Sequence, residues 1–157
     1  MKLILDTSLL GRLCHPTQLK NKSFIAWLNS LLKSEPAETV VFVPEVCDYE
    51  LRRKLIHMIS RGQTTTRSIR ILDELASTFF YLPLDTPTMR RAAELWAELR
   101  SRGVPTAADS ELDGDVILAA QAESVSAIIV TENKKHMSRL GDARSWEELA
   151  AQPPKKG

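Results

Sequence analysis

Four short, nearly continuous apolar runs stand out in the hydrophobic pattern of the chain, and such runs predict buried strands. They cover residues 2–6 (KLILD), 39–43 (TVVFV), 79–82 (FFYL) and 127–130 (AIIV). The second run is also β-branched, as strands prefer. The first run ends in Asp6, whose side chain is therefore expected at the edge of a sheet, with Thr7 and Ser8 beginning an exit loop.

Between these runs, apolar residues recur at the spacing of one helix face. Pro44 and Pro87 fit the first turn of a helix, and Asp85 or Thr86 can cap the helix that contains Pro87. A loop is expected over residues 104–111, which include a proline. The spacing predicts helices over residues 23–32, 44–60, 66–77, 86–103 and 113–123.

Strands that alternate with helices and have apolar interiors indicate a parallel sheet covered on both faces. The predicted fold is therefore an α/β three-layer sandwich around a central, mainly parallel sheet of four or five strands. The chain contains 157 residues, the usual size of one domain. We expect a single domain over residues 1–147 and a frayed tail over residues 148–157, which include two prolines and terminal lysines.

The composition is that of an ordinary globular protein, with 43% hydrophobic and 26% charged residues. The net charge of +1 makes no overall case for nucleic acid, so any such case depends on local basic clusters. Cys14 and Cys47 lack metal-site spacing and are expected to be reduced structural thiols. Asp6 and Arg12 interrupt the apolar N-terminus, and no run approaches the roughly 20 residues of a membrane span, so a cytoplasmic protein without membrane contact is expected.

Three acids fall at or near the predicted strand and helix ends: Asp6, Glu50 and Asp115. Asn133 adds an amide oxygen just beyond the last strand. In open parallel sheets, functional groups gather beyond the carboxyl ends of the strands, and Mg²⁺ prefers oxygen ligands. Each acid taken alone is more often a cap or a loop hydrogen-bonder than a metal ligand.

Four segments in order along the chain resemble the PIN-domain family, and in particular its VapC-like toxins. Residues 3–9 (LILDTSL) are similar to the family's opening strand with its aspartate, and residues 43–53 (VPEVCDYELRR) to its helix with an acid and a basic pair. Residues 115–122 (DVILAAQA) resemble its aspartate and alanine-rich helix, and residues 130–137 (VTENKKHM) its closing loop.

The resemblance implies a metal-dependent endoribonuclease that uses Mg²⁺ or Mn²⁺ and is the toxin of a toxin–antitoxin pair. Its metal site would consist of Asp6, Glu50 and Asp115, with Asn133 at the fourth catalytic position. Thr7 and Thr131 would support the site by hydrogen bonds. The implied partners are an RNA substrate, a cognate antitoxin and a second copy of the chain in a homodimer. Trp27 and Trp96 are candidates for the dimer contact, although each also fits the core.

Asn133 stands where many relatives have an aspartate, which removes one negative charge. Glu132 and Asp113 are nearby acids that could compensate for this loss, although Asp113 is interpreted as a helix cap. Arg53, Lys134 and Lys135 are candidate contacts for RNA phosphates. A lone histidine is rarely catalytic, so His136 is interpreted as a loop or core residue.

Two other functions remain open at this point. A non-catalytic RNA- or protein-binding domain would keep the fold and use the acids only as caps, and the absence of a fourth acid is its best support. A phosphotransfer domain would use Asp6 as phospho-acceptor. That alternative fits poorly, because haloacid-dehalogenase-type enzymes have a second aspartate two residues later, where this chain has Ser8.

Overall fold

A central five-stranded, all-parallel sheet organises the molecule. The computed structural model describes residues 1–34, 38–102 and 109–152. The strand order is β3-β2-β1-β4-β5, so β1 lies in the middle of the sheet. The strands are β1 (Lys2–Leu5), β2 (Val40–Pro44), β3 (Phe80–Leu82), β4 (Ile128–Val130) and β5 (Ala143–Arg144).

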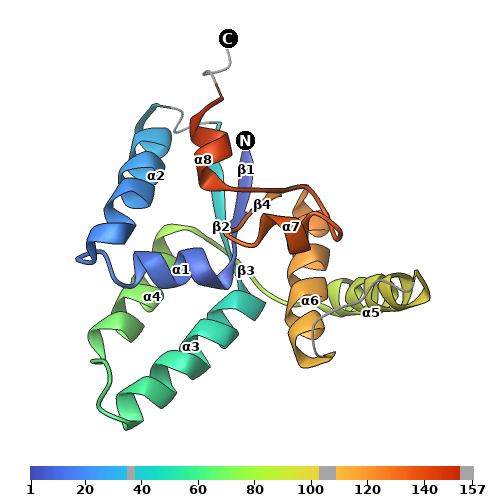
Figure 1. The fold of residues 1–157 in the computed structure, drawn as a ribbon, viewed down its shortest axis with the longest axis horizontal. Helices are drawn as coiled ribbons and strands as arrows, with labels where there is room; N and C mark the ends of the chain where they lie inside the picture. The colour runs from blue at the N-terminus through green and yellow to red at the C-terminus, as the bar shows by residue number, and fades with distance from the viewer. Residues whose placement is uncertain (35–37, 103–108, 153–157) are drawn as a thin grey trace.

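Helices cover both faces of this sheet, which confirms the predicted α/β class. In Figure 1, α1 (Thr7–Leu13), α2 (Lys22–Ser34) and α4 (Arg67–Thr78) lie on one side, and α5 (Thr86–Ser101) and α6 (Asp109–Val125) lie on the other. The long helix α3 (Glu45–Ser60) follows β2 and extends beyond the carboxyl ends of the strands. The short elements are a 3₁₀ turn (Leu19–Asn21), α7 (Lys134–Met137) and α8 (Trp146–Ala150).

The hydrophobic core lies where the central strand meets the helices. Leu3, Ile4 and Leu5 of β1 are completely buried, because β1 has a neighbour on each side and a helix layer on each face. Val41 and Val43 of β2 and Ile129 and Val130 of β4 extend this core. The central strand therefore fixes the position of Asp6, which follows it directly.

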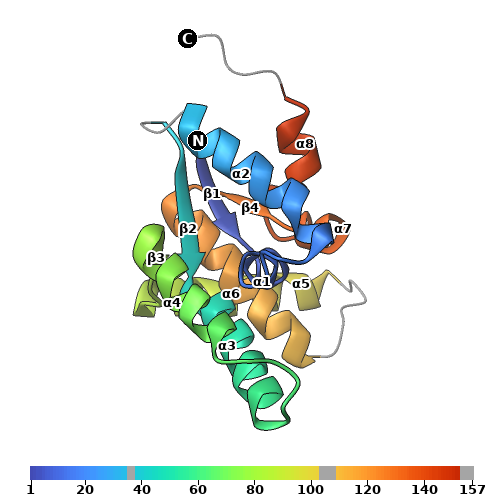
Figure 2. The same ribbon diagram turned by 90° about the vertical axis from the view of Figure 1, so that its left-hand side faces the viewer.

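The aromatic cluster of Phe24, Trp27 and Trp146 joins α8 to α2, with ring centroids about 6 Å apart. Figure 2 shows α8 beside α2. A capping box between Ser145 and Glu148 starts α8, and Leu149 is buried. Residues 146–150 therefore form a packed helix, where the sequence suggested that fraying begins soon after Trp146. Residues 153–157 of the predicted tail lie outside the described residues.

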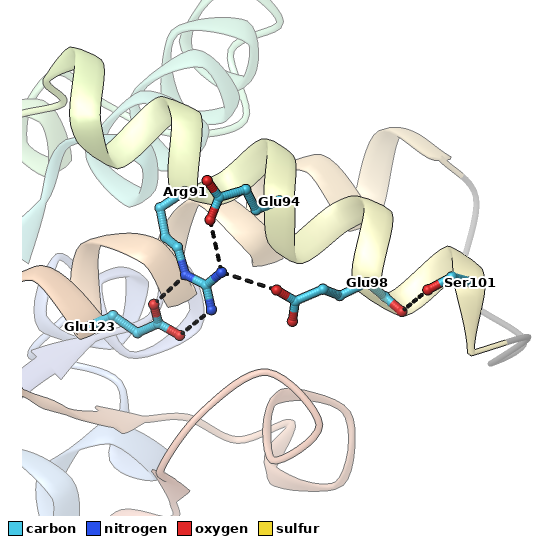
Figure 3. Close-up of polar contacts among 5 residues, drawn as sticks. All are labelled: Arg91, Glu94, Glu98, Ser101 and Glu123. Carbon is cyan, nitrogen blue, oxygen red and sulfur yellow. Dashed lines mark hydrogen bonds and ion pairs between the residues drawn. The ribbon is translucent and has the colours of Figure 1, made fainter.

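An ion-pair network on the surface connects α5 to α6 (Figure 3). Arg91 of α5 donates to both carboxylate oxygens of Glu123 on α6, at 2.7 and 3.3 Å, and also to Glu94 and Glu98. These three carboxylates raise the pKa of the Arg91 guanidinium, Glu123 most of all. The network helps to hold α6, which carries Asp115, against its neighbour.

Three local predictions were wrong. Thr7 and Ser8 begin α1 and do not form a loop, because the Asp6 side chain caps the helix by accepting a hydrogen bond from the Leu9 amide. Pro44 ends β2 and precedes α3. The helix α6 begins at Asp109, earlier than expected, so residues 109–111 are helical. The other residues of the predicted 104–111 loop lie outside the described part of the chain.

Trp27 and Trp96, the candidate dimer contacts, are both partly buried against the core. Arg100 stacks over the Trp96 ring at 4.9 Å.

Cys14 and Cys47 are free and buried, which confirms the expected structural thiols. Among the described residues, every helix is too short or too polar to cross a lipid bilayer.

Candidate metal centre

The candidate acids lie around the carboxyl edge of the sheet, on three different elements. Asp6 follows β1, Glu50 is in α3 after β2, and Asp115 is in α6 before β4. The strands β2, β1 and β4 are adjacent and parallel, so their carboxyl ends lie side by side. This topology brings together residues that are 44 to 109 positions apart in sequence.

Asp6 is fixed by three hydrogen bonds. Its Oδ1 accepts from the Ser8 hydroxyl at 2.7 Å and from the Leu9 amide at 2.9 Å. Its Oδ2 accepts from the Thr131 hydroxyl at 2.6 Å, across the 125 positions that separate β1 from the loop after β4. Thr131 is only 1% exposed, so this contact holds Asp6 from inside the molecule. Thr131 thus donates a hydrogen bond directly to a candidate metal ligand.

Glu50 is held by Thr7 and lies against Gly114. The Thr7 hydroxyl donates to Glu50 Oε2 at 2.5 Å, which connects the start of α1 to α3. A Cβ atom at position 114 would lie 2.2 Å from Glu50 Oε1, far inside van der Waals contact. Glycine at this position therefore leaves the space that the Glu50 carboxylate occupies beside α6.

Asp115 pairs with His136, whose Nε2 lies 2.8 Å from Asp115 Oδ2. Burial raises the pKa of the Asp115 carboxyl above its ordinary value, His136 opposes this rise, and the charges of Glu50 and Asp6 raise the pKa further. The mutual influence is an electrostatic sign that the three carboxylates belong to one group. Like charges held close together in a partly buried place are costly unless a cation or a proton neutralises them.

Cys47 of α3 is 1% exposed. Burial raises the pKa of its thiol well above the ordinary value, a Thr7 hydrogen bond lowers it, and Asp6 and Glu50 raise it. The thiol is consequently neutral at physiological pH. It adds no further negative charge to a site that already holds several.

The loop after β4 contributes Thr131, Glu132 and Asn133. The Asn133 amide donates to the Thr131 hydroxyl at 2.9 Å, and the Asn133 side chain is exposed at the start of α7. Glu132 forms an ion pair with Arg12 of α1. Because Arg12 neutralises it, Glu132 is a poor substitute for the missing fourth acid.

The candidate RNA-binding residues differ in their availability. Lys134 pairs with Glu148 of α8, and this contact lowers the pKa of Glu148. Lys135 is exposed, with no ion pair among the residues that the structure describes. Arg53 is exposed and stacks over the Tyr49 ring. Arg53 and Lys135 are therefore the more available of the three for a phosphate.

The sequence pattern does not indicate three residues that contact the candidate acids, namely Ser8, Gly114 and His136. His136 was interpreted as a loop or core residue, whereas it lies in α7 and contacts a candidate metal ligand. The interpretation of Asp113 as a helix cap was wrong, because α6 begins at Asp109 and Asp113 is inside it. Asp113 is exposed and lines a pocket together with Glu50 and Arg53.

The oxygen donors suit a hard divalent cation in their chemistry. Glu50 Oε1 and Asp115 Oδ1 accept no hydrogen bond from the described residues. Within residues 1–34, 38–102 and 109–152, however, no three His, Cys, Asp or Glu side chains are grouped closely enough to hold a metal as they stand.

Comparison with known proteins gives one family and one fold. The PIN domain family matches residues 3–143. No curated protein matches the chain. Similar solved structures include VapBC2 from Rickettsia felis bound to a promoter DNA fragment, with 18% identity and a TM-score of 0.69 over 93% of this chain and 99% of that one.

FitAcB from Neisseria gonorrhoeae is similar with 19% identity and a TM-score of 0.68, over 94% of this chain and 99% of that one. PAE2754 from Pyrobaculum aerophilum has 20% identity and a TM-score of 0.57, with 96% of each chain covered. At these identities the likeness shows the fold alone. It leaves the activity to be argued from the site.

Proposed function

The chain belongs to the PIN-domain family, and from that premise we propose that it is a metal-dependent endoribonuclease that hydrolyses RNA phosphodiester bonds. The observation that carries the proposal is that the Glu50 carboxylate lies between Thr7, which follows Asp6, and Gly114, which precedes Asp115, at the carboxyl edge of the sheet. Three carboxylates from three elements, fixed by Thr7, Thr131 and His136, form a negative site that a divalent cation would stabilise.

Mg²⁺ or Mn²⁺ would be held by Asp6, Glu50 and Asp115, and Asn133 would lie at the fourth position of the site. A bound cation of this kind supplies activation of water and neutralisation of the charge that builds on a phosphodiester. Thr131 and Thr7 hold the Asp6 and Glu50 carboxylates in place for this role.

The basic residues have a separate task in the proposed reaction. Arg53 and Lys135 would bind phosphates of the RNA on either side of the acids, and Lys134 would do so after release from Glu148. Phosphate contacts of this kind position the RNA without selecting its sequence.

The proposed biological role is that of a toxin, supported by the resemblance to VapC-like proteins. A cognate antitoxin would inhibit it by placing a basic group, most simply a guanidinium, in the negative site. A cytoplasmic location is part of the proposal, because the RNA substrate is found there. We also propose a homodimer, and light scattering that gives a monomer mass at micromolar concentration would reject it.

The test is to sequence RNA ends after induced expression of the wild-type chain and of Asp6→Asn. Asn caps helices about as well as Asp, so the variant should fold. New RNA ends in the wild type that are absent from the variant, together with Mg²⁺-dependent cleavage by the purified protein, are the expected result. Identical RNA ends for both proteins would remove the nuclease proposal.

A non-catalytic RNA- or protein-binding domain is the second candidate. The observation in its favour is that each of the three acids already has a partner within the protein, including the Asp115–His136 pair. Under this alternative the wild type and Asp6→Asn would bind a partner equally well, and neither would cleave RNA with any divalent cation.

A further inference from the structure

Tyr49 is an aromatic residue whose exposure the fold does not explain. It is 61% exposed, although α3 buries Val46, Leu51 and Leu55 on its inner face. Tyr49 and Glu50 line the same pocket, so the ring lies beside the acidic site. An exposed ring beside a candidate active site is typical of a residue that contacts a ligand.

Arg53 lies one helical turn after Tyr49 and covers its ring, with Cζ 5.1 Å from the ring centroid. Arg53 forms no ion pair with the part of the chain that the structure describes. Its neighbour Arg52 is different, because Asp48 and Asp73 both bind it. The charge of Arg53 is therefore free to meet an anion from outside.

Tyr49 and Arg53 line one pocket together with Glu50 and Gly114. Leu84 and Ile117 supply apolar surface to the same pocket. The pocket thus combines a flat π surface, an unpaired cation and an apolar wall, and it contains the carboxylate that Gly114 accommodates. A group held against Tyr49 and Arg53 would lie next to the proposed site of cleavage.

We propose that Tyr49 and Arg53 form a stacking platform for an unpaired nucleobase next to the scissile phosphate. This inference rests on the proposed nuclease function. Unpaired bases stack on aromatic rings and on guanidinium planes, whereas bases inside a duplex are not accessible in this way. A nucleotide meets both features of the platform, because its base offers a π face and its phosphate meets Arg53.

An apolar protein surface fits the same place less well. It would remove water from Arg53 without providing an opposite charge, which costs free energy. The pocket also contains the acids Glu45, Glu50 and Asp113, which disfavour an apolar surface and a phosphate group alike and so do not distinguish the two ligands.

The experiment measures binding by fluorescence anisotropy, with a short fluorescein-labelled single-stranded RNA of mixed sequence and with the same RNA annealed to its complement. The full chain is used in EDTA, so that binding is independent of cleavage. The variants are Tyr49→Ala, Tyr49→Phe and Arg53→Gln. The matched control is Phe80→Ala, because Phe80 is 64% exposed, on strand β3, and does not line the pocket.

Tyr49→Ala is expected to weaken single-strand binding by about 5- to 100-fold, the range for loss of one base stack. Tyr49→Phe keeps the ring and should stay within about twofold of wild type, as should the Phe80→Ala control. Arg53→Gln should weaken binding and flatten its salt dependence. The wild type should bind the duplex more weakly than the single strand. Melting temperatures verify that each variant is folded.

Unchanged single-strand binding by folded Tyr49→Ala would overturn the platform. If that variant instead changed the mass of the protein in light scattering, the surface would be a protein contact and the proposal would equally be wrong. Failure of the nuclease proposal is distinguishable, because it appears as absent cleavage in Mg²⁺ for the wild type, whatever the anisotropy shows. Loss of binding in Tyr49→Ala without cleavage by any protein would support the platform alone.

Discussion

Gly114→Ala tests whether the position of Glu50 matters for the proposed reaction. The new methyl group would lie 2.2 Å from Glu50 Oε1, whereas ordinary contact begins at 3.4 Å. The carboxylate must therefore move by about 1.2 Å. The same carboxylate accepts the 2.5 Å hydrogen bond from Thr7 through Oε2, so this movement should weaken or break that bond.

The cost to folding should be small, because two effects oppose each other. Loss of a hydrogen bond to a charged group costs roughly 1.5–3 kcal/mol. Replacement of glycine by alanine inside a helix returns up to about 1 kcal/mol. We therefore expect a net loss of about 1 kcal/mol, or a Tm lowered by about 2–4 °C for a chain of this size.

The cost to activity should be large, because displacement of a catalytic group by about 1 Å can lower the rate by roughly 100-fold. The assay is Mg²⁺-dependent cleavage of RNA by the purified variant, with thermal unfolding measured in parallel. The matched control is Gly11→Ala in α1, where the nearest atom to the new methyl group is Leu51 Cδ1 at an ordinary 3.7 Å. That variant should cleave normally and melt at the same or a higher temperature. A Gly114→Ala protein that cleaves at the wild-type rate would refute the reasoning.

Three further predictions follow from the site and the core. Asp115→Asn should stabilise the EDTA-treated protein at pH 7, because burial and the neighbouring acids raise the Asp115 pKa and so make its ionised form unfavourable. The pKa of Asp115 is higher in the folded than in the unfolded protein, so the destabilisation disappears as the pH falls through the folded pKa towards the ordinary 3.8. The free energies of unfolding in urea of the wild type and the variant should therefore become equal at the acid end of that range. Burial raises the pKa of Cys14 to about 12 and that of Cys47 well above normal, so Ellman's reagent should react with both thiols only after unfolding, and rapid labelling of the native protein would contradict their burial. Mg²⁺ or Mn²⁺ at a hundred times its Kd should stabilise the fold by about 2.7 kcal/mol, and a Tm that rises equally in Asp6→Asn would argue against the proposed ligand set.

The sequence pattern predicts the long, strongly patterned elements well. The strand before Asp6, the helix of residues 23–32 and the cap at Asp85 are all present, because period and capping chemistry are local properties of the chain. β5 consists of Ala143 and Arg144 alone, too short for any periodicity, and it pairs with β4 only through tertiary structure.

The candidate site is harder to predict, because its contacts join residues that are distant in sequence. Family resemblance makes Asp6, Glu50 and Asp115 the candidates, but no local pattern indicates that His136 would reach Asp115. The close approach of Glu50 to Gly114 is likewise a property of the packing between α3 and α6. Capping signals for α8 were available at Ser145 and Glu148 and were missed because the following residues are polar and proline-rich.

The hydrogen bonds of Asp6 also limit how it can coordinate a cation. A carboxylate has about two lone-pair positions on each oxygen, and Ser8 and Leu9 occupy both on Oδ1. Thr131 occupies one on Oδ2, so a single position is left. In the proposed metal site, Asp6 would therefore coordinate a cation through Oδ2 alone. That would suit Mg²⁺ or Mn²⁺ better than Ca²⁺, which often binds a carboxylate through both oxygens. The hydrogen bonds by which Asp6 caps α1 would thereby favour Mg²⁺ or Mn²⁺ over Ca²⁺ at the proposed site.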